Sequence, residues 1–475
     1  MCSGRCELLT RMVEFLRVPL SRVCSKRRTS KASLNMEQQK ELDSLQLKYQ
    51  ARAKELGISA SALQQSSALP FVKARCSVGT EIVVRVLQWN LLAEGLSNDG
   101  FLVRNVLSEE SDEAFKSVVK QVVEARESGE DMDLLKEKLA SPQSSENHKA
   151  VLDWALRWTR MLLYVTVALP DIITLQELDH MSSAEEDLGR LGYECSTPGK
   201  RYRAAHSNMV GYASKKADPV EYFNHLVRTG VSFIPKTNSQ CRQIGKQDDD
   251  GVAIFWRREV FDVVDVDFLM FEDVKRNHGA VRVNLKRKDD RTALTVIATH
   301  LNSGASQNDE RIRMDQWGKP SFGRDGELNG PSLREWFITS ASTGPTLFCM
   351  DSNSAPGQQF DLWRELCSLS TDSGARNLWS DFYDKDGKPL RDPTPVTTNK
   401  MRGPLSGQPA KIGEHAIGAI DNVIFSKHCS REQFAWEPLK YATKAEALDD
   451  LLPSLNVPSD HMPVIVDFKI NHQAK

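Results

Sequence analysis

The stretch VPSDHMPVIVDF, residues 457–468, decides how the rest of the chain is interpreted. Its second half, PVIVDF, is an apolar run typical of a buried strand. Asp460 and His461 stand just before this run, and such a pair at the mouth of a strand can bind a metal and contact a phosphate together. Because a tripeptide matches by chance in many proteins, the prediction depends on complementary groups elsewhere in the chain.

Five upstream apolar segments are also predicted to be strands, and each carries polar side chains at or near one end. The segments and side chains are 82–87 with Asn90, 171–175 with Glu177, 294–299 with His300, 346–350 with Asp351 and Asn353, and 420–425 with Asp421. Each polar residue alone has an ordinary explanation, such as a turn, an exposed carboxylate or a hydrogen-bonded histidine. Their ordered appearance at strand ends predicts one site for metal-assisted hydrolysis of a phosphate ester.

Glu177 is the strongest single candidate for a metal ligand. A carboxylate directly after a buried strand is costly unless it is paired or binds a cation. Magnesium binds few protein carboxylates and keeps its waters, so one glutamate with helper groups makes a credible site. Asp421 lies among apolar residues and needs a buried partner, for which His461 is the candidate. Their hydrogen bond would fix the imidazole tautomer and favour its charged form.

The composition is that of a soluble globular protein, with 40% hydrophobic and 27% charged residues among 475. The formal net charge is −2, so any phosphate binding has to come from a local patch or a metal. No apolar stretch is long enough to span a bilayer. The nine cysteines are scattered without a CxxC pair, which predicts reduced thiols in an intracellular protein.

The chain divides into a basic N-terminal segment and one large domain. Residues 1–35 are rich in arginine and lysine, as in an organelle transit peptide or a disordered basic tail, so a cytoplasmic and a mitochondrial or other organellar location both stay open. Residues 36–80 are predicted to be a helix and a linker, and residues 81–472 the domain. We expect insertions in this domain near 97–150, which is acidic and should be helical and peripheral, and near 195–230.

Strands outnumber helices after residue 230, and several adjoin as hairpins, including candidates at 251–256 and 280–285. Residues 151–169 are predicted to form a strongly apolar helix that Pro170 ends. This pattern predicts mixed β-sheets with helices outside, rather than a doubly wound parallel sheet.

In order and context, these motifs resemble the endonuclease/exonuclease/phosphatase superfamily, and most closely its nocturnin-like and related deadenylase branch. They cover residues 81–470 apart from the two insertions and a variable stretch near 318–340. The matching stretches are VLQWNLLAEGL, WALRWTRMLLYVTVALPDIITLQELDH, FIPKTNSQC, DDDGVAIFW, VIATHLNSG with ERIRMDQ, LFCMDSNSAP, AIDNVIFS and VPSDHMPVIVDF.

The resemblance implies a four-layer α/β sandwich, in which two mixed β-sheets pack face to face between helices. It implies a hydrolase that uses Mg²⁺, or Mn²⁺, and shortens RNA from the 3′ end, as a poly(A)-specific 3′–5′ exoribonuclease does. Because the chain lacks a basic surface for RNA, a protein partner would assist recruitment. The implied roles are metal binding by Glu177 with Asn90 and Asp460, water orientation by Asp351, phosphate contact by Asn353 and His300, and charge stabilisation by His461 braced by Asp421.

Three alternatives stay open: an NADP(H) 2′-phosphatase, a hydrolase of a phospholipid or an inositol phosphate, and a catalytically inactive scaffold. Lys236, in FIPK, matches a basic residue near the substrate in nocturnin-type proteins that remove the 2′-phosphate of NADP(H). Asn302, Gly304 and Ile417 stand where that pattern has cations, which weakens phosphate recognition. Ser352 replaces the usual Phe between Asp and Asn, which are both kept. Further cations that could compensate are Lys200, Arg201, Arg203 and Arg242.

Overall fold

The structure, a computed structural model, describes residues 34–66, 72–75, 82–108, 112–202, 219–235, 250–272, 279–323, 325, 327–357 and 360–471. These residues belong to a compact unit that begins at Leu34. Residues 1–33, nearly all of the predicted basic segment, lie outside the described residues, as does Lys236.

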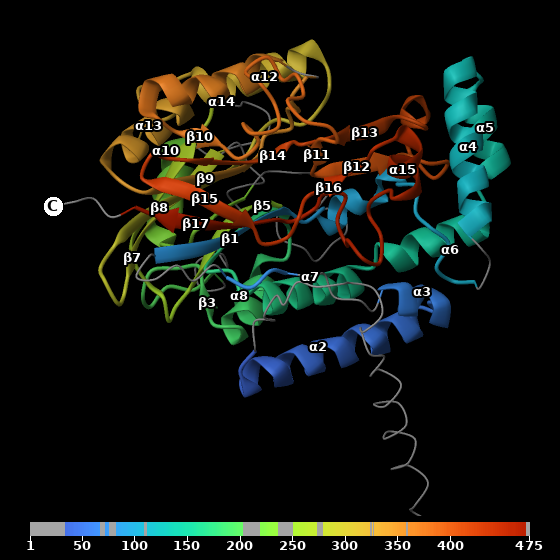
Figure 1. The fold of residues 1–475 in the computed structure, drawn as a ribbon, viewed down its shortest axis with the longest axis horizontal. Coiled ribbons are helices and arrows are strands. Elements are labelled where there is room, and N and C mark those ends of the chain that lie inside the picture. Colours follow the sequence, from blue (N-terminus) through green and yellow to red (C-terminus); the bar gives the residue numbers. More distant parts are fainter. Residues whose placement is uncertain are drawn as a thin grey trace, which may run out of the picture. The chain divides into compact units, whose positions relative to one another are not determined.

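The first of two large β-sheets has the strand order β15-β17-β1-β2-β5-β3, and β4 also pairs with β5 (Figure 1). β1 and β2 run parallel, and the other neighbours run antiparallel. The strands are β1 (Ile82–Asn90), β2 (Ile172–Leu178), β3 (Tyr193–Glu194), β4 (Phe233–Pro235), β5 (Gly251–Arg257), β15 (Cys429–Phe434) and β17 (Val464–Ile470).

The second sheet has six strands in the order β10-β14-β9-β8-β7-β6, with β8 and β9 parallel. The strands are β6 (Phe261–Met270), β7 (Gly279–Arg287), β8 (Ala293–His300), β9 (Thr346–Asp351), β10 (Arg376–Asn377) and β14 (Asp421–Phe425). Two small ribbons pair β11 (Pro395–Val396) with β16 (Leu439–Lys440) and β12 (Thr398–Met401) with β13 (His415–Gly418).

The two sheets pack against each other because alternate residues along their strands are apolar. Val84 and Val86 of β1 share a buried cluster with Val283 of β7, Val296 of β8 and Val423 of β14. The residues between them face outward from the sandwich and need a cover, which helices supply.

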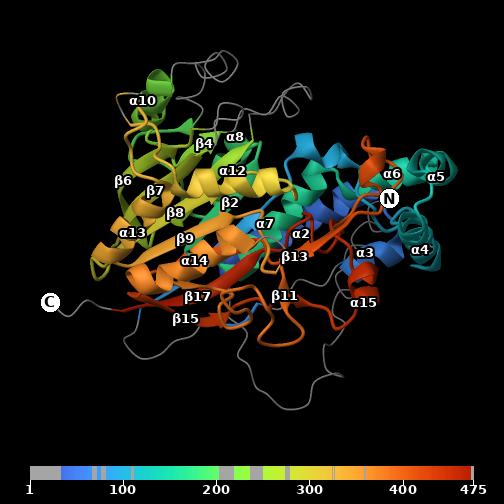
Figure 2. The same cartoon turned by 90° about the horizontal axis from the view of Figure 1, so that it is seen from above.

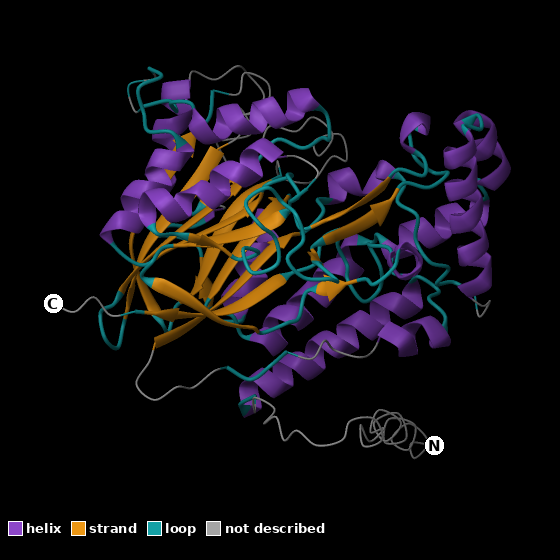
Figure 3. Ribbon diagram, turned by 45° about the horizontal axis from the view of Figure 1, so that its top comes forward, coloured by secondary structure: helices purple, strands orange, loops and turns teal. Residues whose placement is uncertain are grey.

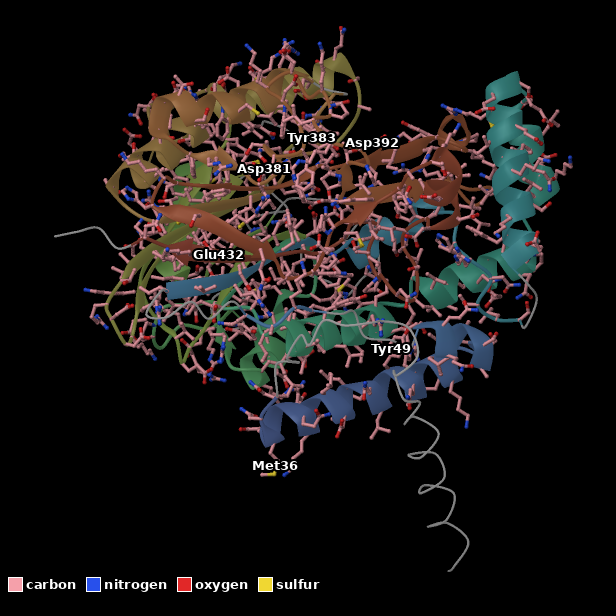
Figure 4. All side chains as sticks on the ribbon, in the orientation of Figure 1. Met36, Tyr49, Asp381, Tyr383, Asp392 and Glu432 are labelled. Atoms are coloured by element: carbon pink, nitrogen blue, oxygen red, sulfur yellow. The ribbon has the colours of Figure 1, made fainter. Side chains whose placement is uncertain are left out.

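Helices cover the outer face of each sheet (Figure 3). α2 (Met36–Glu55) and α7 (Trp154–Ala168) bury Leu87 of β1 and Ile173 of β2. Tyr49 of α2, labelled in Figure 4, is buried in the same cluster. α12 (Gln307–Gly318), α13 (Leu333–Thr343) and α14 (Phe360–Ser373) bury Ile297 of β8 and Phe348 of β9. The predicted α/β sandwich of two mixed sheets flanked by helices is therefore confirmed.

The acidic segment near 97–150 is helical, as predicted. Its helices are η1 (Glu94–Asp99), α4 (Asp112–Ser128), α5 (Met132–Leu139) and α6 (Pro142–Val151). The sequence suggested a peripheral position, but buried side chains of α4 and α5 share a cluster with Met401 of β12 and with Ile412. The remaining helices are α3 (Ala60–Ser66), α8 (Met181–Arg190), α10 (Pro219–Thr229), η3 (Pro409–Lys411) and α15 (Lys444–Asp449).

Strand β6 was not predicted from the sequence. Three aspartates interrupt its apolar pattern, and its pairing with β7 shifts register between Val263 and Asp265. β6 also lies at the edge of its sheet, where polar residues are tolerated.

Within the described part of the chain, no helix has both the length and the apolar character needed to cross a bilayer. The cysteines described there are Cys195, Cys349, Cys367 and Cys429, and each is a free thiol.

Candidate active site

The strand pairing brings the predicted residues to one edge of the sandwich. Parallel β1 and β2 place Asn90 beside Gln176, next to Glu177. Parallel β8 and β9 place His300 opposite Asp351. Antiparallel β14 begins at that edge, so its first residue, Asp421, also lies opposite Asp351. Residues far apart in sequence therefore meet because strand ends of both sheets share this edge.

One carboxylate oxygen, Oδ2 of Asp351, lies at the centre of the cluster. The side-chain nitrogen of Asn90 donates to it over 2.8 Å, and the Nε2 atoms of His300 and His461 lie 3.5 and 3.9 Å away. Oδ1 of Asp351 accepts the Asn353 backbone N–H over 2.9 Å. Asp351 is 1% exposed, so these donors define the environment of its carboxylate.

Glu177 is held next to this centre by the same asparagine. The Asn90 nitrogen donates to Glu177 Oε1 over 3.1 Å, and the Ala93 N–H donates to Oε2 over 3.2 Å. Glu177 has φ 55°, where the pairing of β2 and β5 shifts register between Leu175 and Leu178. Such strained backbone at a bulge often aims a functional side chain. The Asn90 oxygen accepts from Leu92 N–H over 3.0 Å, so its nitrogen serves the two carboxylates.

Asn353 and His300 lie beside the two carboxylates. Asn353 has φ 49°, and its side-chain nitrogen donates to the Leu301 carbonyl over 3.1 Å. His300 Nε2 lies 4.0 Å from Glu177 Oε1, and the residue is 4% exposed. His300 is therefore positioned by the end of β8, and Asn353 by the loop that follows β9.

Asp421 and His461 form the predicted pair. Nδ1 of His461 lies 2.8 Å from Oδ2 of Asp421, and the Gln88 side-chain nitrogen donates to the other Asp421 oxygen over 2.8 Å. Burial alone would lower the pKa of His461. The negative charges of Asp421, Asp460 and Asp351 outweigh this effect and raise the pKa to about 9, so the imidazole is charged at neutral pH.

Lys400 is a member of the cluster that the sequence did not indicate. Its ammonium donates to Oδ2 of Asp460, the predicted helper of the metal. Burial would raise the pKa of Asp460, but the charges of Lys400 and His461 lower it to about 2. Lys400 lies on the four-residue strand β12, which is too short for a sequence pattern to predict. Only the pairing of β12 with its neighbours places this lysine.

A buried arginine joins the two chain segments that carry Asn90 and Asp460. The Arg157 guanidinium donates to the carbonyls of Leu91, Leu92 and Pro458 over 2.9, 2.8 and 3.0 Å. Burial lowers the pKa of Arg157 to about 10, which leaves it charged at neutral pH. No sequence pattern indicated this role, because Arg157 lies within the apolar helix α7.

We expect Arg157→Met to destabilise the protein by about 3 kcal/mol, because three buried carbonyls would lose their donors. Urea unfolding of the variant and the wild type measures this difference. Arg190→Met, on the exposed surface of α8, is the matched control and should change stability by less than about 0.5 kcal/mol. Equal stability of Arg157→Met and wild type would contradict the proposed joining role.

A second buried pair supports the opposite side of the site. Arg313 of α12 donates to Glu310 over 2.8 Å and to the Asn302 and Gly304 carbonyls over 2.8 and 2.9 Å. Glu310 also accepts from the Leu362 N–H over 2.9 Å. The loop after His300 is thus fixed to α12 and α14 without the cations expected at residues 302 and 304.

No protein-family model matches the chain. Nocturnin of Xenopus laevis is 26% identical over 325 residues, which are 67% of this chain and 66% of that protein. Human nocturnin is 24% identical over 327 residues, 68% of this chain and 60% of that protein. The matches thus span less than two thirds of either relative. The chain is thus similar to nocturnin, in line with the resemblance of its motifs to the endonuclease/exonuclease/phosphatase superfamily. A solved structure of the human nocturnin catalytic domain with a bound sulfate anion is also similar to this chain. The matched region covers 82% of this chain and 94% of that domain, with 20% identity and a TM-score of 0.44.

The nocturnin-like chain departs from the superfamily pattern at Ser352, and the structure gives the departure a physical explanation. The Ser352 hydroxyl donates to the Ile420 carbonyl over 2.7 Å and accepts from the Asn422 side chain over 2.9 Å. These bonds join the ends of β9 and β14. They hold Asp351 opposite Asp421 without an aromatic side chain at residue 352.

Proposed function

We propose that this chain is a divalent-metal-dependent phosphoester hydrolase, and that it acts as a 3′–5′ exoribonuclease of the deadenylase type. The observation that carries the proposal is the arrangement of Glu177 and Asp351 around the Asn90 nitrogen, beside the Asp421–His461 pair. Carboxylates that lie this close repel each other unless a cation compensates for them. A site with these groups suits metal-assisted attack of water on phosphorus.

The residues fit Mg²⁺, or Mn²⁺, because they supply hard oxygen donors at one place. Glu177 would hold the ion, with Asn90 orienting its carboxylate and Asp460 as a further helper. Asp351, Asp421 and His461 also offer ligand atoms within 4.8 Å of one another. Asp421 and His461 are already hydrogen-bonded to each other, so Glu177 is the better candidate for the metal ligand. A bound ion would polarise the phosphate and favour the ionised form of water.

The other residues would position the substrate and move a proton. Asp351 would orient the attacking water and take its proton, because its carboxylate is held next to the candidate metal ligand Glu177 by the shared Asn90 nitrogen. His300 and Asn353 would contact the phosphate oxygens. His461 would stabilise the negative charge that develops at phosphorus, since Asp421 keeps it charged and in one orientation.

RNA is the substrate that we favour, and NADP(H) is the second candidate. The match of Lys236 to a substrate-binding lysine favours NADP(H), whereas Asn302, Gly304 and Ile417 replace cations of that pattern. The formal net charge of −2 supports a protein partner that helps to recruit RNA. An inactive scaffold is disfavoured because the charged groups at the site are complementary and connected.

The proposal is tested with purified protein, Mg²⁺ and three substrates: labelled oligo(A), a mixed-sequence RNA and NADPH. Stepwise shortening of oligo(A) supports the exoribonuclease, and shortening of both RNAs alike would remove the poly(A) preference. Release of inorganic phosphate from NADPH supports the phosphatase instead. Equal results for wild type and Glu177→Ala on all three would contradict the catalytic proposal.

A further inference from the structure

Lys400 lies in the candidate site, but no role follows for it from the proposed function. Among the charged side chains described above for the site, Glu177 and Lys400 are the most exposed, at 14% and 18%, whereas Asp351, Asp421 and His461 are at most 2% exposed. A ligand that enters the site from solvent therefore meets these two side chains first. One is an anion suited to a metal, and the other is a cation.

The Lys400 ammonium can donate more hydrogen bonds than the one it makes to the described residues. It has three N–H groups, and its one hydrogen bond to the described residues is to Asp460 Oδ2. The negative charge of Glu177 also acts on this ammonium. A phosphate held by an ion at Glu177 would thus carry its oxygens into the field of this ammonium.

Strand β12 is held against the candidate site by hydrogen bonds, so the backbone of Lys400 stays next to the site. Thr398 forms a β-bridge with His461, and its hydroxyl donates to the Asp460 carbonyl over 2.8 Å. The Met462 N–H donates to the Thr397 carbonyl over 2.7 Å. Lys400 is therefore carried by the same backbone that positions the Asp460–His461 pair.

The acidic helical insertion supports β12 from the other side. Met401 and Ile412 are buried with Val122 of α4 and Leu135 of α5. The Lys136 ammonium of α5 donates to the Ser406 carbonyl over 2.9 Å. Figures 1 and 2 show α4 and α5 on the same side of the unit as α15, in agreement with an ion pair between Lys444 of α15 and Glu127 of α4. These contacts with α4 and α5 hold the ribbon of β12 and β13, and therefore Lys400, in place.

We propose that Lys400 is a substrate-binding residue, which contacts the phosphate of the substrate and supplies positive charge that Asn302, Gly304 and Ile417 do not. The inference rests on the proposed phosphoester hydrolase and names the part of the site that recognises its anionic group. The ammonium pairs with Asp460 when the site is empty of substrate. It offers its remaining N–H groups to a phosphate oxygen when substrate is bound.

A purely structural lysine would act only by neutralising Asp460, and a double substitution separates the two roles. Inorganic phosphate in the presence of Mg²⁺ is the probe, and calorimetric titration gives its Kd. We compare Asp460→Asn with Lys400→Met/Asp460→Asn, because neither variant leaves a buried carboxylate without its cation. The proposal expects the second substitution to weaken phosphate binding about tenfold, as the loss of one charge-assisted contact would.

Three further variants complete the experiment. Lys400→Arg keeps the charge and should bind phosphate within about threefold of the wild type, and Lys400→Met alone should bind about tenfold more weakly. Lys411→Met, an exposed lysine on η3 of the same ribbon, is the matched control and should bind like the wild type. Thermal unfolding confirms that each protein is folded.

Two results would overturn the proposal: equal phosphate affinity of Asp460→Asn and the double variant, or no phosphate binding by the wild type. Failure of the proposed function is a separate outcome. If no phosphoester is hydrolysed but Lys400→Met/Asp460→Asn still binds phosphate about tenfold more weakly than Asp460→Asn, the binding role stands and the hydrolase does not.

Discussion

Glu177→Ala is expected to lower turnover of the true substrate by about a thousandfold, because the site loses its best metal ligand and with it the charge that stabilises the transition state. Asn90 would keep its bond to Asp351, and the backbone of β2 would keep its pairing, so the variant should fold. Turnover is measured at saturating substrate over a range of Mg²⁺ concentrations. Any activity that remains should require a higher Mg²⁺ concentration than the wild type does.

The control for this substitution is a carboxylate of the same sheet outside the site. Glu194→Ala, at the exposed residue of β3, should leave both turnover and the Mg²⁺ requirement within about twofold of the wild type, since surface substitutions have small effects. Glu177→Gln keeps the size of the side chain but not its charge, and should be as inactive as Glu177→Ala. Full activity of Glu177→Gln would show that the carboxylate charge is not required.

Asp421→Asn is expected to lower kcat by about a hundredfold or more and to change KM little. His461 would lose the carboxylate that fixes its tautomer and favours its charged form. Substrate contacts made by other residues would remain. Steady-state kinetics on wild type and variant separate the two constants. A variant with normal kcat would remove the proposed brace, whatever its KM.

The same pair predicts a pH dependence with a definite sign. The pKa of His461 in the folded protein is raised from 6.5 to about 9, so the charge needed for activity is present at neutral pH and is lost as pH rises through about 9. Activity of the wild type should therefore decline on the alkaline side. In Asp421→Asn the decline should begin at lower pH, because the largest raising influence is gone.

The free energy of unfolding should also decline as pH rises. A histidine whose pKa is higher in the folded state stabilises that state fully below about pH 6.5, and the contribution is lost as pH rises towards about 9. Urea unfolding of the wild type across this window should show declining stability, and Asp421→Asn should decline less. An equal decline in both proteins would assign the pH dependence to other groups.

Most of the candidate site could be predicted because its residues follow strands with a strong apolar pattern. Asn90, Glu177, His300 and Asp351 each stand at such a strand end, and the end of a buried strand is visible in sequence. The pairing of Asp421 with His461 was also predicted, because a carboxylate among apolar residues needs a partner. The substrate-binding role of Lys236 stays a prediction, since this residue lies outside the described residues.

Other parts of the site had no sequence signal. Lys400 sits on a strand of four residues, and Arg157 sits in a helix whose other residues indicate only burial. The carbonyls that Arg157 binds come from the neighbours Leu91 and Leu92 and from Pro458, which lies more than 300 residues further along the chain. Periodicity reports which face of an element is buried, but it does not report which distant segment lies against that face.

The sequence by itself determined that mixed sheets are covered by helices, and which types of polar group stand at the strand ends, because these depend on local patterns of apolar and polar residues. The packing of two such sheets was implied only by the resemblance to a known superfamily. Only the tertiary structure decided that one oxygen of Asp351 lies next to Asn90, His300 and His461, that Lys400 pairs with Asp460, and that helices α4 and α5 pack against β12. These contacts depend on strand register and on the packing of segments remote in sequence. They are set when the whole sandwich closes, and no single element contains them.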